Sequence, residues 1–425
     1  MALEPEALRV GATRVGYREG RDWLLSPEPL RLEEPVVRRL ERLGHPLRMF
    51  QAAGERIYRR SVNGTLPGWI ADLLDAGKPA WMVEEQRSAA LREAAPRVIR
   101  PDLLLGEDGM ALTELDAVPG GMGLTGWLSA TYAAEGFPVM GGARGMPEGF
   151  RKVLPDGGRV LVSEEAGDYR MEMEWLVEAM NSGGQERWTV GPAEEDTGED
   201  GAVYRFFELF DWEAVPAARA LAPRADVTPP FKPLFEEKLW LALLWSPALV
   251  EVWEDELRGS HLKQLRDLAP YAWVVDPMPL PPHAALPRLN VNSWDQVAGF
   301  SQKRRRLVLK ISGFNEQAWG SRGVVVGHDV SGPEWAAALE RACGDFDTQP
   351  WLVQEFREAK VVEHPYFDPE SGEVAVMRGR VRLCPYYFVD AAGETALGGC
   401  LAAIAPADKK KIHGMRDAIL VPCRR

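Results

Sequence analysis

Residues 100–126 read RPDLLLGEDGMALTELDAVPGGMGLTG, and this stretch predicts two short strands joined by a tight turn. Leu103–Leu105 and Met110–Leu115 are the strand candidates, and Gly106-Glu107-Asp108-Gly109 lies between them. An Asp-Gly pair between apolar runs is a strong signal for a β-hairpin. The remaining chain is therefore interpreted around a hairpin at this position.

Three carboxylates flank the predicted hairpin. Glu114 and Asp116 are two residues apart, so they point to one face of a strand, and an antiparallel neighbour brings Asp102 beside them. Carboxylates so close repel one another unless a cation lies between them, and oxygen ligands suit Mg²⁺. The turn at Gly120-Gly121 would let a substrate approach closely. The alternative is a solvated acidic surface, which is the commoner origin of an isolated Glu-x-Asp by roughly 4 to 1.

Composition and charge limit the classes of function. The chain has 425 residues, enough for two or three domains, and its 46% apolar and 27% charged residues are typical of a globular protein. The net charge of −13 argues against nucleic-acid and anionic-membrane partners, which need a basic surface. We find no metal-ligand spacing among the four cysteines, no signal peptide and no apolar run long enough to span a bilayer. We therefore expect a cytoplasmic protein with reduced thiols.

Hydrophobic periodicity predicts the other elements. Residues 1–95 are expected to be largely helical and rich in arginine, and the Gly- and Pro-rich residues 136–149 form a linker. A β-α-β order then predicts a parallel sheet, with strands at 159–163 and 188–190 and a helix at 169–181 whose apolar side is Met171, Trp175, Leu176 and Met180. Residues 233–257 predict a helical segment broken at Ser246-Pro247. The last third predicts α/β structure, with strands at 306–311, 324–326, 350–356 and 397–404, one or two more within 373–389, and a helix at 333–343.

The last third also suggests a nucleotide site. Lys310 ends a strand, a loop with Gly313, Ser321 and Gly323 follows, and a later strand ends in Gln354-Glu355. A lysine can hold a phosphate as a point charge, and backbone N–H groups of such a loop can surround phosphate oxygens. Each signal alone is weak, since a lysine at a strand end is more often a surface residue by roughly 5 to 1.

The two regions together resemble the ATP-grasp ligases. The string Arg-x-Asp, a hairpin and then Glu-x-Asp-x-x-Pro-Gly-Gly is similar to the metal-binding hairpin of that family, which more often has Asn where this chain has Asp116. The lysine strand, the glycine loop and the Val-Gln-Glu strand follow in the family's order, although the loop departs from the usual paired-glycine form. Because the hairpin precedes the nucleotide half, the chain resembles the circularly permuted group that includes glutathionylspermidine-synthetase-like amide ligases.

The resemblance implies a fold and a set of site residues. The fold class would be α/β (α+β), an ATP-grasp architecture in permuted order with a small Rossmann-like domain and a helical N-terminal segment, divided at 1–135, 150–280 and 285–425. The metal ligands would be Asp102, Glu114 and Asp116, the catalytic residues Arg100 and Arg382, and the substrate-binding residues Gly120 and Gly121. Nucleotide would be bound by Lys238, Lys310, Ser321, Arg322, Gly323, Gln354 and Glu355. Arg382 is preferred to its neighbours Arg378 and Arg380 for a phosphoryl contact, and an exposed strand face is the alternative for that row.

The implied reaction joins a small carboxylate to a small amine with ATP and Mg²⁺ as cofactors. The carboxylate would attack the γ-phosphate, and the amine would displace phosphate from the acyl-phosphate. Two other interpretations stay open: a phosphotransferase that needs no amine, and a nucleotide-binding protein without catalysis. The oligomeric state and the identity of the substrates are not determined by the sequence.

Overall fold

The structure is a computed structural model that describes residues 3–18, 23–182, 187–281, 283–318, 322–409, 412 and 417–425. The chain forms two compact units, and each unit combines segments that are distant in sequence. Unit 1 consists of Met1–Arg48, Ser88–Phe231 and Glu358–Arg425, and unit 2 consists of Met49–Arg87 and Lys232–Arg357. The division along the sequence at 1–135, 150–280 and 285–425 stays a prediction.

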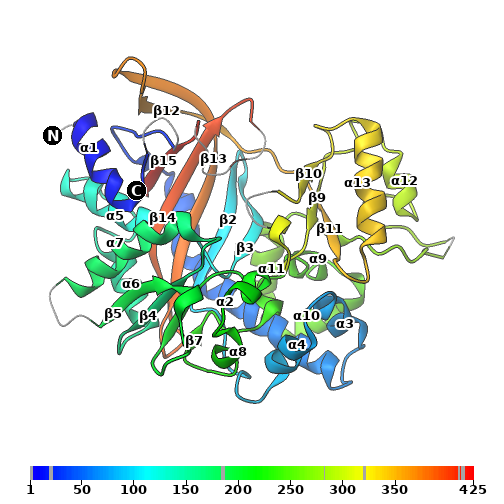
Figure 1. The fold of residues 1–425 in the computed structure, drawn as a ribbon. Helices are drawn as coiled ribbons and strands as arrows, with labels where there is room; N and C mark the ends of the chain where they lie inside the picture. Colours follow the sequence, from blue (N-terminus) through cyan, green and yellow to red (C-terminus); the bar gives the residue numbers. More distant parts are fainter. Residues whose placement is uncertain are drawn as a thin grey trace. The chain divides into compact units, whose positions relative to one another are not determined.

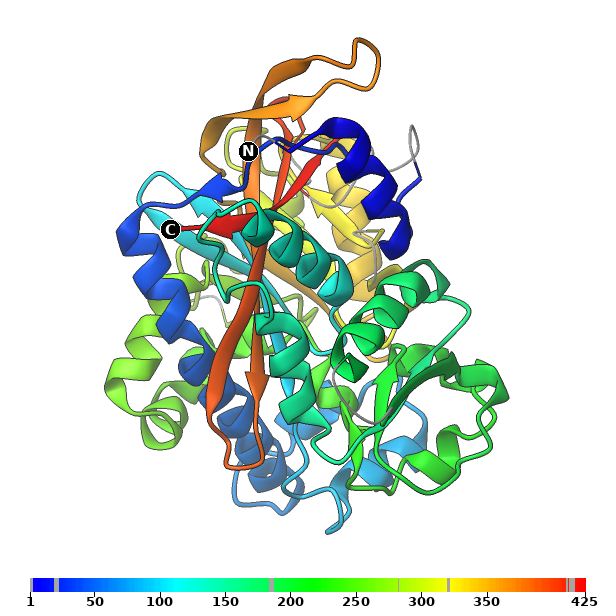
Figure 2. The same ribbon diagram turned by 90° about the vertical axis from the view of Figure 1, so that its left-hand side faces the viewer.

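The large sheet of unit 1 carries the hairpin. Its strand order is β1-β15-β14-β13-β2-β3, and β12 also pairs with β13. The pairs are antiparallel except β1 with β15. The long strands β13 and β14 run side by side in both views (Figures 1 and 2). The strands are β1 (Leu30–Arg31), β2 (Val98–Gly106), β3 (Gly109–Asp116), β12 (Val361–Phe367), β13 (Val374–Val389), β14 (Thr395–Pro406) and β15 (Ile419–Arg424).

A second sheet of unit 1 is parallel, as the β-α-β order predicted. Its strand order is β5-β4-β6-β7, with β4 (Gly158–Val162), β5 (Trp188–Pro192), β6 (Val203–Phe206) and β7 (Val227–Thr228). Helix α7 packs against β5 and against α5 and α6, which in turn pack against strands of the large sheet. The helices of this unit are α1 (Pro5–Ala12), α5 (Met122–Ala134), α6 (Gly145–Val153), α7 (Arg170–Asn181) and α8 (Ala218–Leu221), with 3-10 turns η1 (Thr13–Val15), η2 (Gly167–Tyr169), η3 (Ala193–Glu195) and η4 (Leu209–Ala214).

Unit 2 is built on an antiparallel sheet of order β10-β9-β11-β8, which Figure 1 shows beside α12 and α13. Its strands are β8 (Ala272–Val274), β9 (Leu307–Ile311), β10 (Val324–Val326) and β11 (Trp351–Glu355). Tryptophans 273, 294, 335 and 351 anchor the core between sheet and helices. The helices are α3 (Trp69–Asp75), α4 (Ala80–Arg87), α9 (Trp240–Leu243), α10 (Val250–Glu256), α11 (Gly259–Leu268), α12 (Trp294–Ala298) and α13 (Gly332–Gly344), with 3-10 turns η5 (Pro233–Phe235), η6 (Pro247–Leu249) and η7 (Glu316–Ala318). Helix α2 (Glu34–Val62) begins in unit 1 and ends in unit 2.

Several predicted elements have different bounds in the structure. The helical segment expected over 233–257 has the predicted break at Ser246-Pro247, where η6 begins, but its first half is also divided, into η5 and α9. The expected linker 136–149 already contains the start of α6. The region 373–389, expected to hold one or two strands, contains the single strand β13 (Val374–Val389). In α7 the buried residues are Glu172, Met173, Leu176, Val177 and Met180, whereas Met171, which we had expected on the apolar side, is exposed.

All four cysteines are free, and Cys384, Cys400 and Cys423 are buried. Within the ranges described above, none of the helices combines the length and the apolar character that a bilayer crossing requires.

Candidate functional site

The hairpin of unit 1 has the register that the sequence predicted. Asp102 on β2 lies opposite Glu114 on β3, and Arg100 lies opposite Asp116. The register shifts between Asp102 and Leu103, so the charged part of the ladder is separated by an irregularity from the apolar part. Side chains two apart share a face, so these four residues form one polar group on the hairpin.

Asp102 lies between two arginines. Its Oδ1 is 3.1 Å from Nε of Arg100 and its Oδ2 is 2.7 Å from Nη1 of Arg382, which reaches it from β13. The thiol of Cys384 donates to Oδ1 at 3.5 Å. Burial would raise the pKa of Asp102, but the two guanidinium groups hold it below its ordinary value. Asp102 is therefore an ionised, 4% exposed carboxylate that already has its counter-charges.

Asp116 has one arginine partner, whereas Asp102 has two. Its Oδ2 is 2.6 Å from Nη2 of Arg100, and its Oδ1 accepts the Val118 N–H at 2.9 Å. Burial raises its pKa, and the negative charges of Glu114 and Asp102 add to the rise, although Arg100 opposes it. Glu114 and Asp116 are thus close enough to repel one another, an environment that favours an additional cation.

The expected group of three metal ligands is not formed. In the residues that the structure describes, no three His, Cys, Asp or Glu side chains are placed to hold a metal ion. The reason is that Asp102 turns both oxygens to Arg100, Arg382 and Cys384. Glu114 and Asp116 alone still fit Mg²⁺, which often takes only one or two carboxylates and completes its shell with phosphates and water. Metal binding at this hairpin stays a prediction.

The glycine turn is packed against tyrosines of its own unit. A Cβ on Gly120 would collide with the ring of Tyr169, and a Cβ on Gly121, whose φ is +82°, would lie 2.6 Å from the hydroxyl of Tyr386. The carbonyl of Gly120 accepts from Arg100 Nη1 at 2.9 Å and from the Tyr386 hydroxyl at 2.7 Å. The close approach that we predicted for a substrate is made here by side chains of the protein, and a substrate contact stays a prediction.

Glu172 links α7 to the glycine turn. Its two carboxylate oxygens accept the N–H groups of Gly121 at 2.7 Å and Leu124 at 2.9 Å, at the start of α5. Free N–H groups at a helix start favour a negative charge there. Burial nevertheless raises the pKa of Glu172 to about 7, because it outweighs those donors and the nearby charge of Arg100.

In unit 2 the predicted nucleotide residues Lys310 and Gln354 lie on adjacent strands. Lys310 is on β9 and Gln354 on β11, and Nζ of Lys310 donates to Oε1 of Gln354 at 2.8 Å. Both residues are buried, at 7% and 2% exposure. This hydrogen bond orients the Lys310 side chain toward the strand end Gln354-Glu355 on β11.

Lys238 lies in the turn before α9 and not on a long helix. Its Nζ donates to the carbonyl of Ala318 at 3.0 Å, which ties it to the loop after β9. The preceding residue, Glu237, forms a buried ion pair with Lys78 at 2.5 Å and accepts from the hydroxyl of Ser312 and the N–H of Gly313. The start of the predicted phosphate loop is thereby fixed to the turn 236–239.

The remaining predicted residues of unit 2 fall into three groups. Glu355 pairs with Arg288 at 2.9 Å and with Arg357 at 3.1 Å. Gly323 bonds to Gln317 and Ile311, and a Cβ there would collide with the Ile311 side chain, while its neighbour Arg322 is exposed. Ser321 lies outside the described residues.

Sequence reasoning missed five residues of these two polar centres: Tyr169, Glu172, Cys384, Tyr386 and Lys78. They come from η2, α7, β13 and the segment before α4, which are distant in sequence from the residues that they contact. Spacing identifies neighbours within one strand or one helix, so it carried no signal for them.

Comparisons with known proteins bear on the fold. No family model matches the chain, and no curated protein matches it. Among solved structures, it is similar to a glutathione synthetase-like effector from Globodera pallida, with a TM-score of 0.57, 12% identity, and coverage of 99% of this chain and 98% of that chain. A putative gamma-glutamylcysteine synthetase from Methylobacillus flagellatus KT has a TM-score of 0.41 at 12% identity, covering 87% and 84%. The chain is thus a mixed α/β protein that shares the fold of the first of these structures over nearly its whole length.

Proposed function

We propose that this protein is an ATP-dependent ligase that joins a small carboxylate to a small amine through an acyl-phosphate and releases ADP and phosphate. The observation that carries the proposal is the Lys310–Gln354 pair, a buried ammonium beside the strand end Val-Gln-Glu. This is the order of a lysine strand, a loop and a Gln-Glu strand that the resemblance to ATP-grasp ligases implies. The likeness in fold to a protein named for glutathione synthetase supports the same class of reaction.

We propose roles for residues of each unit taken by itself. In unit 2, Lys238 and Lys310 would hold phosphates as point charges, and the Gln354-Glu355 strand end would accept hydrogen bonds from adenine and ribose. In unit 1, Arg100 and Arg382 would bind the substrate carboxylate and stabilise the negative charge that grows as it attacks phosphorus. Glu114 and Asp116 would hold Mg²⁺, which shields phosphate charge when it is bound.

The reaction needs no nucleophilic side chain. A carboxylate oxygen of the substrate forms a bond to the γ-phosphorus as ADP leaves. The amine nitrogen then bonds to the acyl carbon, phosphate leaves, and the nitrogen loses a proton. Arginine remains charged throughout, which suits a step that brings two anions together.

The test is release of ADP and phosphate from MgATP against a panel of amino acids, small peptides and polyamines. We expect release only when a carboxylate and an amine are both present. Lys310→Met should lower kcat/KM by about 100-fold, the usual effect of removing one group that stabilises a transition state. Lys303→Met, at an exposed lysine of the same unit, should leave it unchanged.

A second candidate is a nucleotide-binding protein without catalysis. The contact that favours it is the pairing of Asp102 with Arg100 and Arg382, since a carboxylate so neutralised is a poor metal ligand. The same assay separates the two functions: tight ATP binding that Lys310→Met weakens, with no release for any pair of substrates, would support the second candidate.

A further inference from the structure

Unit 2 contains a cavity of about 640 Å³. Its walls come from α3, α9, β8 and the segments that follow β8 and α13. None of the described residues that we assign to nucleotide binding lines it. The volume is within the range that holds a small organic molecule in known binding sites. The cavity is therefore a candidate for a ligand other than ATP.

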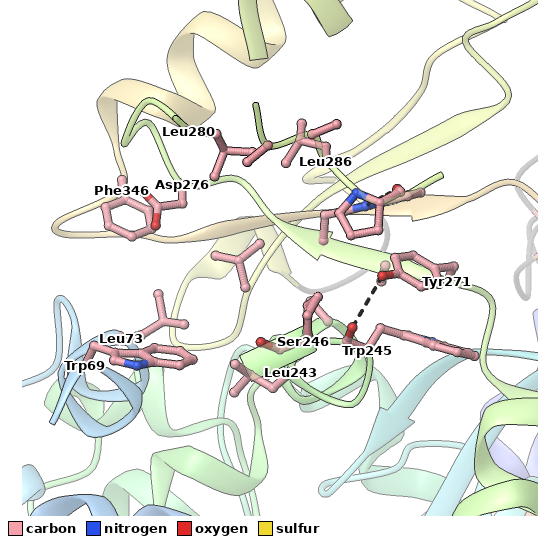
Figure 3. A pocket seen from close by; sticks show the side chains of 18 of the residues that line it. Trp69, Leu73, Leu243, Trp245, Ser246, Tyr271, Asp276, Leu280, Leu286 and Phe346 are labelled. Atoms are coloured by element: carbon pink, nitrogen blue, oxygen red, sulfur yellow. Dashed lines mark hydrogen bonds between the residues drawn. The ribbon is translucent and has the colours of Figure 1, made fainter. Parts of the chain in front are cut away.

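One wall of the cavity contains a row of three aromatic rings that are tilted relative to one another. Tyr271 lies between Trp245 and Trp273, with 4.8 Å between ring centres on each side. The polar atoms of these rings are hydrogen-bonded to backbone carbonyls. The indole N–H groups of Trp245 and Trp273 donate to the carbonyls of Pro270 and Pro287, respectively. The hydroxyl of Tyr271 donates to the carbonyl of Trp245 at 3.4 Å. The wall therefore offers carbon surface to a ligand (Figure 3).

The rest of the lining also contains large apolar side chains. Trp69 and Leu73 project from α3, and Leu280 and Leu286 lie on the segment after β8, with all four around the same space in Figure 3. Trp69 is 41% exposed, although an indole ring is among the largest apolar surfaces that a protein can bury. A ligand in the cavity would cover part of this ring.

The charges of the lining are all of one sign. Asp72, Asp276 and Asp347 line the cavity and are exposed, and neither lysine nor arginine is among its described lining residues. In the ranges that the structure describes, none of the three has an ion pair within 4.0 Å, and Asp276 accepts only the N–H of Met278. Figure 3 shows Asp276 beside the ring of Phe346. A cation would be attracted to the part of the lining that carries these aspartates.

From the aromatic wall and the unpaired carboxylates together, we propose that this cavity binds an organic amine, a molecule with an aromatic or branched apolar body and one protonated nitrogen. The body would cover the apolar surface, and the ammonium would be held by the aspartates. Two rings of this row already have cations near them, since Arg288 lies 5.0 Å from the centre of the Tyr271 ring and Arg266 lies 5.6 Å from the centre of the Trp245 ring. The aspartates, together with Phe346 and Trp69, therefore hold the charge. This inference does not rest on the proposed ligase activity.

The experiment uses two probes of one shape and opposite charge, 4-phenylbutylamine and 4-phenylbutyrate, titrated into the full chain by calorimetry. We expect saturable binding of the amine, at least about tenfold tighter than the carboxylate. Asp276→Asn and Asp347→Asn should each weaken the amine several-fold. The matched control Asp295→Asn, an exposed aspartate of the same unit outside the cavity, should not change the affinity.

A second variant locates the site. Ala285→Trp fills the cavity from an exposed segment and should abolish binding, whereas Lys310→Met should leave it intact because Lys310 is not part of the lining. The proposal is overturned if neither probe binds, if the two probes bind equally, or if the amine binds as well to Ala285→Trp. Failure of the ligase assay has no bearing on any of these results.

Discussion

The ion pair of Arg382 with Asp102 predicts how much the buried charges of the hairpin contribute to stability. Arg382→Ala leaves the buried carboxylate of Asp102 with Arg100 as its remaining guanidinium. Breaking a buried ion pair from one side is strongly destabilising, so we expect the free energy of unfolding to fall by about 3 kcal/mol. Urea denaturation measures this. The control variant is Arg378→Ala, at an exposed position on the same strand. It should change the free energy of unfolding by less than about 0.5 kcal/mol. Equal effects of the two variants would show that the network does not stabilise the fold.

Glu172 predicts a pH dependence of stability. Its pKa rises from 4.5 to about 7 on folding, so between these values the folded chain keeps a proton that the unfolded chain has lost. The contribution of Glu172 is therefore fully present below pH 4.5 and is lost as the pH rises through about 7, by about 3 kcal/mol in total. Asp102 acts in the opposite direction and at lower pH, because its pKa is lowered.

The variant Glu172→Gln checks this assignment. It should remove the decline in unfolding free energy between pH 4.5 and 7, measured by urea denaturation at several pH values. The amide can accept only one of the two N–H groups that Glu172 accepts, so the variant is expected to be less stable than the parent at the acid end. A decline of the same slope in the variant would assign the pH dependence to another group.

How far the sequence predicted the site depends on the distance along the chain. Asp102, Glu114 and Asp116 were placed on one face of a hairpin correctly, because alternation within a strand is local. Glu172 was not found, since a glutamate in an amphipathic helix is normally a solvated residue. Its burial arises only because Gly121 and Leu124 present free N–H groups to α7. The competition of arginines for Asp102 was missed for the same reason, as β13 begins about 270 residues later in the chain.

Among the elements, the contact of α5 with α7 depends on a residue without a side chain. A Cβ on Gly123 would overlap the backbone carbonyl of Glu172, and backbone cannot rotate away as a side chain can. We expect Gly123→Ala to lower the free energy of unfolding by about 3 kcal/mol, the upper part of the range for overpacking. Gly167→Ala, with nothing within 4 Å of its Cβ, should be nearly neutral. Thermal unfolding of both variants compares them, and a Gly123→Ala protein as stable as Gly167→Ala would mean that the helices separate freely.

Helices and strands that are specified by neighbouring residues in the sequence were predicted. Elements whose bounds depend on contacts with distant segments were not. The strands predicted at 324–326 and 350–356 are β10 and β11, and the helix predicted at 333–343 is α13, whose Ser331 capping box the structure reveals. The segment 233–257 looked helical because its residues are apolar at helical spacing. In the structure η5, α9, η6 and α10 follow one another there, and the predicted break at Ser246-Pro247 coincides with the start of η6.

At the scale of the whole molecule, the order of segments along the chain conceals how they group. Unit 2 is made of Met49–Arg87 and Lys232–Arg357, which are separated by more than a hundred residues of unit 1. Composition gives no sign of this, because both segments are ordinary globular sequence. The pairing is specified by buried charges: Lys78 of the first segment meets Glu237 of the second at 2.5 Å, and Glu55 meets Lys232 at 2.7 Å.

These two ion pairs predict that residues 232–357 do not fold alone. The side chains of Glu237 and Lys232 are at most 1% exposed, and in that fragment each of them loses its ion-pair partner. An uncompensated buried charge costs about 3–5 kcal/mol. Two such losses match most of the 5–15 kcal/mol that stabilises a typical domain. We expect the fragment to show no cooperative urea transition and to bind a hydrophobic dye, and residues 49–87 joined to it by a flexible linker to restore the transition. The same two-segment chain carrying Lys78→Met should restore it poorly. A cooperative transition of the fragment by itself would show that the core of β8 to β11 is sufficient and that the first segment is only a covering.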